Sequence, residues 1–224
     1  MNSAIIVAAG QGTRMGPGVD KLFLEVAGLP VVGHTLKCFG AAPGIQEIVI
    51  VAREDQLSTF EELAGALRLN KPFRVVAGGK ERQDSVWNGL EALSPQSELV
   101  AIQDGARPCT SPELIAATLD AARDSGAAVA AQRVNDTIKQ SDDGRVISQH
   151  LERARLWSVQ TPQTFRVEII RRALAAVRQR GLSVTDDTAA CEAIGQAVRL
   201  VEGVAPNPKV TMPGDLAYIG MLLR

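Results

Sequence analysis

The sequence has few cysteines, no excess of one charge and no long apolar run, and each shortage argues against a class of protein. The three cysteines, Cys38, Cys109 and Cys191, are odd in number and far apart, so neither a disulfide framework nor a paired-cysteine metal site is expected. We expect buried free thiols. The formal net charge is −1 without blocks of like charge, which argues against nonspecific nucleic-acid binding and a polybasic membrane patch.

The apolar content is that of a globular protein rather than a membrane protein. Residues 1–10 have no basic leader region, and no apolar run approaches the ~18 residues that would span a bilayer. With 224 residues and 46% hydrophobic content, the chain is long enough for one large core. We therefore expect a soluble, cytoplasmic protein with a single domain over 1–224 and no linker.

Short apolar runs alternate with longer stretches of helical periodicity. Because the apolar runs are continuous, the strands should be buried on both faces, which is typical of a mostly parallel sheet between helices. Ser111-Pro112 and Pro213 are signals for helix starts. The predicted fold class is α/β, with strands at 4–8, 46–52, 73–77, 98–103, 127–132 and 197–201 and helices at 31–42, 55–68, 82–93, 112–124, 167–180, 187–194 and 214–223.

One polar segment interrupts this alternation. Residues 136–151, DTIKQSDDGRVISQHL, show partial alternation on either side of Asp142-Asp143-Gly144, which is a hairpin-turn signal. The segment is too polar for the buried sheet. It predicts either a projecting β-arm with a function or a solvated surface hairpin, and the pattern alone leaves both open.

The first apolar run ends in a glycine loop followed by two cations. In AIIVAAGQGTRMGPGVDKLF, residues 4–23, Gly10 and Gly12 lie where backbone N–H groups can surround phosphate oxygens, with Arg14 and Lys21 close behind. The loop has neither the dinucleotide spacing, since Gly16 comes one residue late, nor a Walker lysine. It predicts a polyphosphate site. The alternative is an ordinary glycine turn.

Three further polar clusters fall at strand-to-helix junctions. QDGARP, 103–108, supplies Asp104 for a metal or a sugar hydroxyl and Arg107 for a phosphate. VTDDTAA, 184–190, places Thr185 and Asp186 where a helix begins, with simple N-capping as the alternative. NPKVTMPGDL, 207–216, places Lys209 after the last predicted strand. Four such clusters in one α/β chain predict a single site.

These motifs make the chain resemble a known family. AAGQGTRMG with Lys21 is similar to the signature of sugar-phosphate nucleotidyltransferases, and the full set resembles the 2-C-methyl-D-erythritol 4-phosphate cytidylyltransferase family. The resemblance spans nearly the whole chain, through AAGxGxRMG (8–16), GGxERxDSV (78–86), DGARP (104–108), DT (136–137), LW..QTPQ.F (156–165), TDD (185–187) and NxKVTxPxDL (207–216).

The resemblance implies a reaction and a fold. Such enzymes transfer a cytidylyl group from CTP to 2-C-methyl-D-erythritol 4-phosphate, release pyrophosphate and serve the non-mevalonate isoprenoid pathway, on a Rossmann-like sheet. The substrate's own phosphate oxygen would attack, so no general base is needed and His34 and His150 are expected to be structural. The residues implied for the triphosphate are Ala8, Ala9, Gly10 and Gly12, with Arg14 and Lys21 as transition-state stabilisers.

The remaining implied roles concern the base, the acceptor and the metal. Gly79, Lys80 and Ser85 would bind the nucleotide, while Trp87 packs in the core. Mg²⁺ is implied, held mainly by phosphate oxygens, with Asp104 as the candidate protein ligand. The residues implied to position the substrate are Asp104, Arg107, Thr137, Arg153, Thr161, Thr185 and Lys209.

The resemblance also gives the arm, about 136–153, a purpose. It implies a homodimer in which the arm swaps across a two-fold axis, so that Thr137 and Arg153 reach the partner's site and meet Lys209 there. Arg155 matches no family role. The sequence departs from the family pattern at Gly105 and Pro206. The alternatives are a ribitol 5-phosphate cytidylyltransferase and a nucleotide-sensing module without catalysis; the presence of Arg14, Lys21, Asp104 and Lys209 argues against the second.

Overall fold

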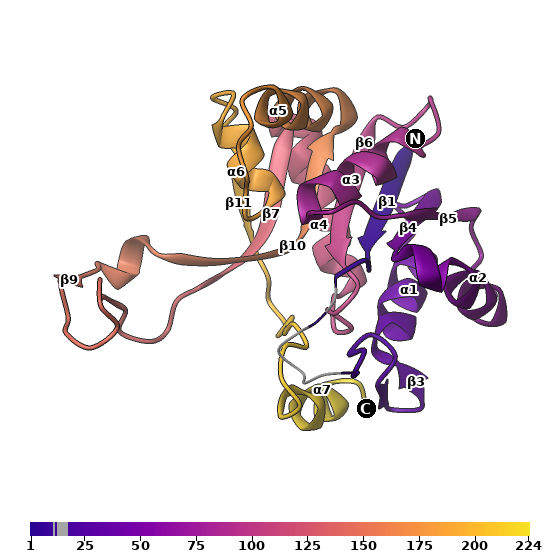
Figure 1. Ribbon diagram of the computed structural model, residues 1–224, viewed down its shortest axis with the longest axis horizontal. Helices are drawn as coiled ribbons and strands as arrows, with labels where there is room; N and C mark the ends of the chain where they lie inside the picture. The colour runs from indigo at the N-terminus through magenta and orange to yellow at the C-terminus, as the bar shows by residue number, and fades with distance from the viewer. Residues whose placement is uncertain (11, 13–17) are drawn as a thin grey trace.

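The computed structural model describes residues 1–10, 12 and 18–224, and its centre is one seven-stranded sheet (Figure 1). All neighbouring strands are parallel except around β10, which runs antiparallel to both of its neighbours. The predicted α/β class with a mostly parallel sheet is confirmed. In spatial order the strands are β11 (Arg199–Glu202), β7 (Ala127–Arg133), β10 (Trp157–Arg166), β6 (Leu99–Asp104), β1 (Asn2–Val7), β4 (Glu47–Ala52) and β5 (Phe73–Ala77).

Helices cover both faces of the sheet, and the side chains of β1 show how the two cores divide. Ala4 and Ile6 belong to one buried cluster and Ile5 to the other, because successive strand residues point to opposite faces. The first cluster includes side chains of α1 (Val31–Ala41), α2 (Leu57–Ala66) and α4 (Pro112–Ser125). The second includes side chains of α3 (Arg82–Glu91), α5 (Val167–Gln179) and α6 (Asp187–Glu192).

The ends of α4 show how local sequence sets the helix boundaries. The Ser111 hydroxyl accepts a hydrogen bond from the Leu114 N–H at 3.2 Å, and Pro112 occupies the first turn. Gly126 ends the helix with φ of 87°, and a Cβ there would lie 2.5 Å from Ile169 Cδ1. The predicted start at Ser111-Pro112 is confirmed. All seven predicted helices form; α7 covers Asp215–Leu222, and a 3₁₀ turn at Glu54–Gln56 leads into α2.

The structure corrects the prediction at β10, which the sequence pattern missed. Its sequence, WSVQTPQTFR, contains a proline and several polar residues, so it has neither a continuous apolar run nor strict alternation. Yet Thr161, Gln163 and Thr164 are buried, and the ladder to β7 shifts register between Val159 and Gln163. The short hairpin of β2 (Glu25–Val26) and β3 (Leu29–Pro30) was also not predicted.

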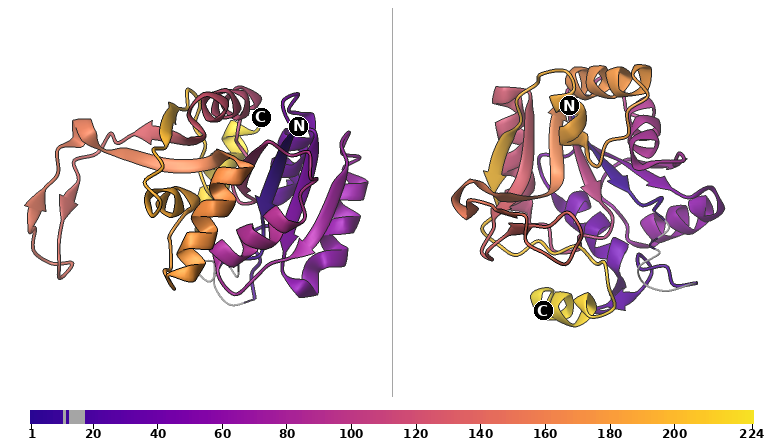
Figure 2. Two further views of the ribbon diagram at one scale, coloured as in Figure 1. Left: turned by 90° about the horizontal axis from the view of Figure 1, so that it is seen from above. Right: turned by 60° about the vertical axis from the view of Figure 1, so that its left-hand side comes forward.

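The polar segment forms the predicted arm. β8 (Lys139–Gln140) pairs with β9 (Gln149–His150), and the Asp143 carboxylate accepts hydrogen bonds from the N–H groups of Arg145 and Val146. A 3₁₀ turn at Arg153–Arg155 follows. The arm extends well beyond the body of the molecule (Figures 1 and 2). Val146 and Ile147, near its tip, are 68% and 63% exposed.

The thiols of all three cysteines are free, but only Cys191 is fully buried, because Cys38 and Cys109 lie at partly open positions. Trp87 packs half-buried against the second core with the Arg178 guanidinium over its ring. Within the part of the chain that the structure describes, no helix has the length and apolarity to cross a membrane.

Candidate active site

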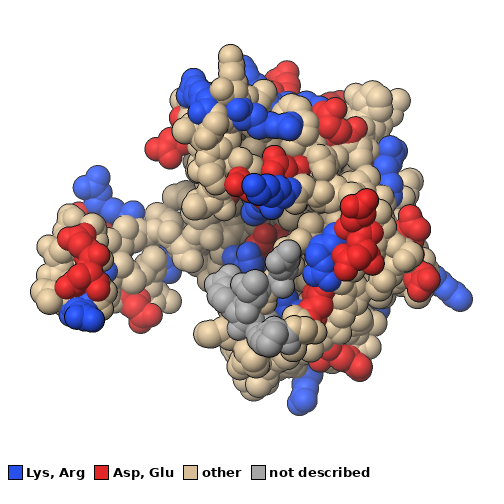
Figure 3. All heavy atoms as spheres, in the orientation of Figure 1, with Lys and Arg blue, Asp and Glu red and all other residues tan. Residues whose placement is uncertain are grey.

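A cavity of about 630 Å³ opens where β1 and β6 end at their carboxyl termini. Figure 3 shows basic and acidic side chains gathered around a hollow in the middle of one face. Ligands of open α/β sheets bind at this edge. The cavity brings together many residues predicted from the sequence, and its wall includes Ala8, Ala9, Gly10, Lys21, Gly79, Lys80, Ser85, Asp104 and Lys209.

Two glycines allow the backbone to approach the cavity closely. A Cβ on Gly78 would lie 2.4 Å from the Cβ of Ala9, and one on Gly79 would lie 2.2 Å from the Cβ of Asp84. The Ser85 hydroxyl accepts a hydrogen bond from the Gly79 N–H at 3.1 Å and donates to the Glu81 carbonyl at 3.2 Å. Residues 78–81 are thus held in a fixed shape, as a backbone-lined binding wall requires.

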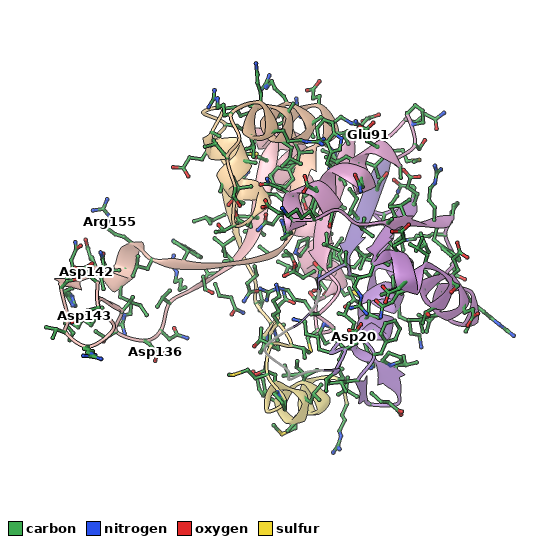
Figure 4. All side chains as sticks on the ribbon, viewed as in Figure 1. Asp20, Glu91, Asp136, Asp142, Asp143 and Arg155 are labelled. Carbon is green, nitrogen blue, oxygen red and sulfur yellow. The ribbon has the colours of Figure 1, made fainter. Side chains whose placement is uncertain are left out.

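Lys21 is held at the opposite wall. Its ammonium donates to the Val210 carbonyl at 2.9 Å, and a Cβ on Gly12 would rest 3.6 Å from its side chain. The preceding Asp20, labelled in Figure 4, accepts hydrogen bonds from the Leu22 N–H at 3.0 Å and the Gln56 amide at 2.8 Å. Its carboxylate also pairs with Arg53 at 3.2 Å. Arg14, the other predicted stabiliser, lies outside the described residues.

Asp104 is the electrostatic centre of the cavity. Its carboxylate lies 2.7 Å from the Lys209 ammonium, 3.6 Å from Arg107 Nε and 3.9 Å from Arg82 Nε. Burial alone would raise the pKa of Asp104, but the three cations outweigh it and hold this pKa below its usual value. The site is therefore net positive around an ionised carboxylate, which suits an anionic ligand.

Hydrogen bonds connect the segment that carries Lys209 to the loop after β6 and to β10. The Arg107 guanidinium donates to the Asn207 carbonyl at 2.6 Å, and the Asn207 amide donates to the Thr161 carbonyl at 2.8 Å. The Val210 N–H donates to the Ala106 carbonyl at 2.8 Å. Burial lowers the pKa of Arg107, although Asp104 opposes this shift. Despite the unusual Pro206, the segment carrying Lys209 is therefore well anchored.

The two predicted threonines lie in different surroundings. Thr161 is buried in β10, where its hydroxyl accepts from the Asp104 N–H at 3.1 Å. Thr185 is exposed in the loop before α6. The adjacent Asp186 caps that helix by accepting from the Ala189 N–H at 2.9 Å, so the capping role proposed for this motif belongs to Asp186.

The whole arrangement has close counterparts among known proteins. The family model for IspD, 2-C-methyl-D-erythritol 4-phosphate cytidylyltransferase, matches residues 2–224. The chain belongs to this cytidylyltransferase family. It is 42% identical over 223 residues to the 2-C-methyl-D-erythritol 4-phosphate cytidylyltransferase of Pelotomaculum thermopropionicum, covering 99% of this chain and 94% of the relative. It is 43% identical over 221 residues to a bifunctional enzyme IspD/IspF of Desulforudis audaxviator, covering 98% of this chain and 56% of that protein.

Solved structures agree with these sequence relatives. The 4-diphosphocytidyl-2C-methyl-D-erythritol synthase of Anaerococcus prevotii superposes with a TM-score of 0.88 at 32% identity, covering 100% of this chain and 96% of that one. The 2-C-methyl-D-erythritol 4-phosphate cytidylyltransferase of Thermus thermophilus superposes with a TM-score of 0.79 at 32% identity, covering 99% of this chain and 98% of that one. The resemblance inferred from the motifs and the predicted enzyme class are confirmed.

Two residues predicted for the cytidylyltransferase site are not near the cavity of their own chain. Thr137 and Arg153 belong to the arm, and the Arg153 guanidinium donates to the Asn135 carbonyl at 2.7 Å. Both side chains are exposed, and the arm points away from the cavity (Figure 1). Neither residue therefore contributes to the cavity of its own chain.

Sequence reasoning missed several charged residues around the cavity, including Glu54 and Glu81 in its wall. Arg53 and Arg82 line it, and the buried Asp187 pairs with Arg82. Arg82 is the arginine of the GGKERQDSV motif, 78–86, to which the sequence analysis assigned no role. Its place in that motif was a signal that could have identified it. Asp187 likewise stands inside the TDD motif, 185–187, but its pairing with Arg82 could not be seen, because the two residues lie 105 positions apart in the sequence.

Among the described residues, no cluster of three or more histidine, cysteine or acidic side chains could hold a metal ion. The Asp104 carboxylate faces the cavity among three cations, and Glu54 and Glu81 also line the wall. This donor set fits an ion that takes most of its ligands from substrate phosphates and water, as Mg²⁺ does.

Proposed function

We propose that this chain transfers the cytidylyl group of CTP to 2-C-methyl-D-erythritol 4-phosphate, giving 4-diphosphocytidyl-2-C-methyl-D-erythritol and pyrophosphate. The observation that carries the proposal is the cavity, which combines the backbone wall at Gly78 and Gly79 with the cations around Asp104. A nucleoside triphosphate and a phosphorylated acceptor both need such positive surroundings.

The chemistry requires a phosphate oxygen of the acceptor to bond to the α-phosphorus while the bond between that phosphorus and the bridging oxygen breaks. Pyrophosphate leaves with the electron pair. The attacking oxygen is already ionised near neutral pH, so positioning and charge stabilisation suffice. Lys21 and Arg14 stabilise the charge that develops at the α-phosphate, and Lys209 and Arg107 hold the acceptor.

The two histidines have contacts that suit structural roles. His34 shares a hydrogen bond of 2.6 Å with the Val26 carbonyl, and His150 contacts Lys139 across the arm hairpin. Mg²⁺ would be held through phosphate oxygens, with Asp104 as its candidate protein ligand, and it would neutralise phosphate charge. The three free thiols fit a reducing compartment, so we place the reaction in the cytoplasm.

The arm supports a proposed homodimer. A two-stranded hairpin is at best marginally stable alone, and this one exposes Val146 and Ile147. In the proposed dimer the arm crosses to the partner, where Thr137 and Arg153 complete the acceptor half of the partner's cavity.

The experiment is a pyrophosphate-release assay with CTP and either 2-C-methyl-D-erythritol 4-phosphate or ribitol 5-phosphate. We expect release with the first acceptor, and preference for the second would overturn the substrate assignment. UTP in place of CTP should lower kcat/KM by about 10-fold or more, because its O4 is an acceptor where the cytosine amine donates. Equal kcat/KM for both nucleotides would argue against a base pocket at Gly79 and Ser85.

A further inference from the structure

Residues in the first turn of α3 form hydrogen bonds with the segment that carries Thr185. The Arg82 guanidinium donates to the Asp187 carboxylate at 2.8 Å, and Gln83 both accepts from the Val184 N–H at 3.0 Å and donates to the Leu182 carbonyl at 3.2 Å. These contacts join the motif assigned to the nucleotide with the loop assigned to the acceptor.

Asp187, the first residue of α6, is a buried carboxylate. Its side chain is 1% exposed, and its Oδ1 has no hydrogen-bond partner among the described residues. Its N–H donates to the Gln163 side chain at 3.0 Å, and Gln163 in turn donates to Asp186 at 3.0 Å. Burial raises the pKa of Asp187, with Arg82 opposing that shift.

A buried ion pair contributes little net stability compared with apolar packing, because both charges lose their hydration. Stability alone therefore gives no reason for Arg82 and Asp187 to occupy this position. Their arrangement does have a geometric consequence. The Arg82 Nη2 donates to Asp187, and its Nε lies 3.9 Å from the Asp104 carboxylate, so one planar cation lies between the Thr185–Asp187 segment and the cavity centre.

We propose that Arg82 and Asp187 are positioning residues for the acceptor, which fasten the Thr185 loop to the cavity wall at Asp104. The proposal rests on the proposed function. Asp187 does not line the cavity, so it acts through Arg82 and through the loop that precedes α6. Its loss should therefore weaken use of the acceptor while CTP binding stays close to normal.

The test is steady-state kinetics of Asp187→Asn, an isosteric change that removes the buried charge. We expect the KM for 2-C-methyl-D-erythritol 4-phosphate to rise about 10-fold, the scale of one charge-assisted hydrogen bond, with the KM for CTP within about two-fold of wild type. Arg82→Lys is measured in parallel, since it keeps a cation beside Asp187 but cannot bridge two carboxylates. It should raise the same KM.

The matched control is Glu91→Gln. Glu91 ends α3 as Arg82 begins it and also forms a carboxylate–arginine pair, with Arg171 of α5, but it does not line the cavity. We expect both KM values to remain at wild-type level. Thermal unfolding of all variants separates a loss of stability from the kinetic effect.

A double variant tests the route through the loop. If Asp187 acts by placing Thr185, then Asp187→Asn should add little to the KM in a Thr185→Ala background. The inference would be overturned if Asp187→Asn raised the acceptor KM by the same factor in the wild-type and Thr185→Ala backgrounds. It would also be overturned if the KM values for CTP and the acceptor rose equally, or if neither rose in the folded variants. Failure of the proposed function would be seen separately, as no product from CTP and this acceptor with the wild-type protein.

Discussion

At the scale of single residues, Asp104 shows how the cavity keeps an ionised carboxylate among cations. Lys209 comes from the segment between β11 and α7, Arg82 from α3, and Arg107 from the loop that follows Asp104 at the end of β6. Arg82 is also held by Asp187 and Arg107 by the Asn207 carbonyl, so the loss of Lys209 would leave two cations to keep Asp104 ionised. The resulting surplus of positive charge is available to the triphosphate and the acceptor phosphate.

Lys21→Ala and Arg14→Ala should each lower kcat by about 100- to 1,000-fold, because each removes a cation aimed at charge that develops in the transition state. Folding should persist, as judged by circular dichroism. Lys37→Ala, an exposed change on α1, serves as the control and should keep full activity. Near-normal pyrophosphate release by both cavity variants would contradict the assigned roles.

Glu47 predicts a pH dependence of stability at the opposite edge of the sheet. Burial would raise its pKa, but hydrogen bonds from the Ser94 N–H and the hydroxyls of Ser3 and Ser97, together with Arg74, lower the pKa of Glu47 overall. A lowered pKa stabilises the folded state above the unfolded-state pKa of about 4.3, and this contribution is lost as the pH falls through the folded-state pKa.

Glu47→Gln should therefore lower the free energy of unfolding by about 1.5–3 kcal/mol at pH 7, and the difference from wild type should shrink below about pH 4. Urea unfolding at several pH values measures it. Glu98→Gln is the control, since the Glu98 side chain is 83% exposed and its carboxylate lies 3.5 Å from the N-terminal ammonium. A deficit that stayed constant with pH would show that the charge of Glu47 is not what stabilises the fold.

At the scale of elements, the sequence predicts those helices and strands whose signals lie within a few neighbouring residues. The continuous apolar runs predict β1, β4 and β6, and Ser111-Pro112 predicts the start of α4, because burial and capping act within a few residues. β10 could not be predicted, since its polar residues are satisfied by partners far away in the sequence. Thr164, for example, donates to Thr118 at 3.0 Å.

The same limit applies to the candidate site. The glycine loop, Asp104 and Lys209 follow strand ends and are visible as local motifs. The bond between Arg82 and Asp187 joins two elements whose packing depends on the whole sheet. Only the folded chain brings them together.

The turn at Asp20–Phe23 is an element whose role can be tested. The Asp20 carboxylate ties the turn to Arg53 and Gln56, so it sets where Lys21 points. We expect Asp20→Ala to lower kcat about 10-fold, and Asp20→Asn to lower it less because an amide oxygen still accepts from the Leu22 N–H. Asp55→Asn is the control, since Asp55 also pairs with Arg53 but is 74% exposed. An equal loss in the Asp55 variant would attribute the effect to Arg53 rather than to the turn.

At the scale of the whole molecule, the body and the arm differ in how they are stabilised. The body has two buried cores, whereas the arm has one short ladder and exposed apolar side chains near its tip. A partner that covers the arm would account for both its length and its surface. In a two-fold dimer each cavity would then combine Lys21 of one chain with Arg153 of the other.

This arrangement predicts complementation between two inactive variants. A heterodimer of Lys21→Ala and Arg153→Ala chains has one site with both lesions and one site with neither, provided the arms swap. Random pairing makes about half of the dimers heterodimers, each with one intact site, so mixed chains should recover about a quarter of wild-type activity. Both variants must first be shown to be folded dimers with little activity alone. Heterodimers isolated with two different affinity tags are then assayed at saturating CTP. If they release pyrophosphate no faster than the parent homodimers, Arg153 acts within its own chain or the arms do not swap.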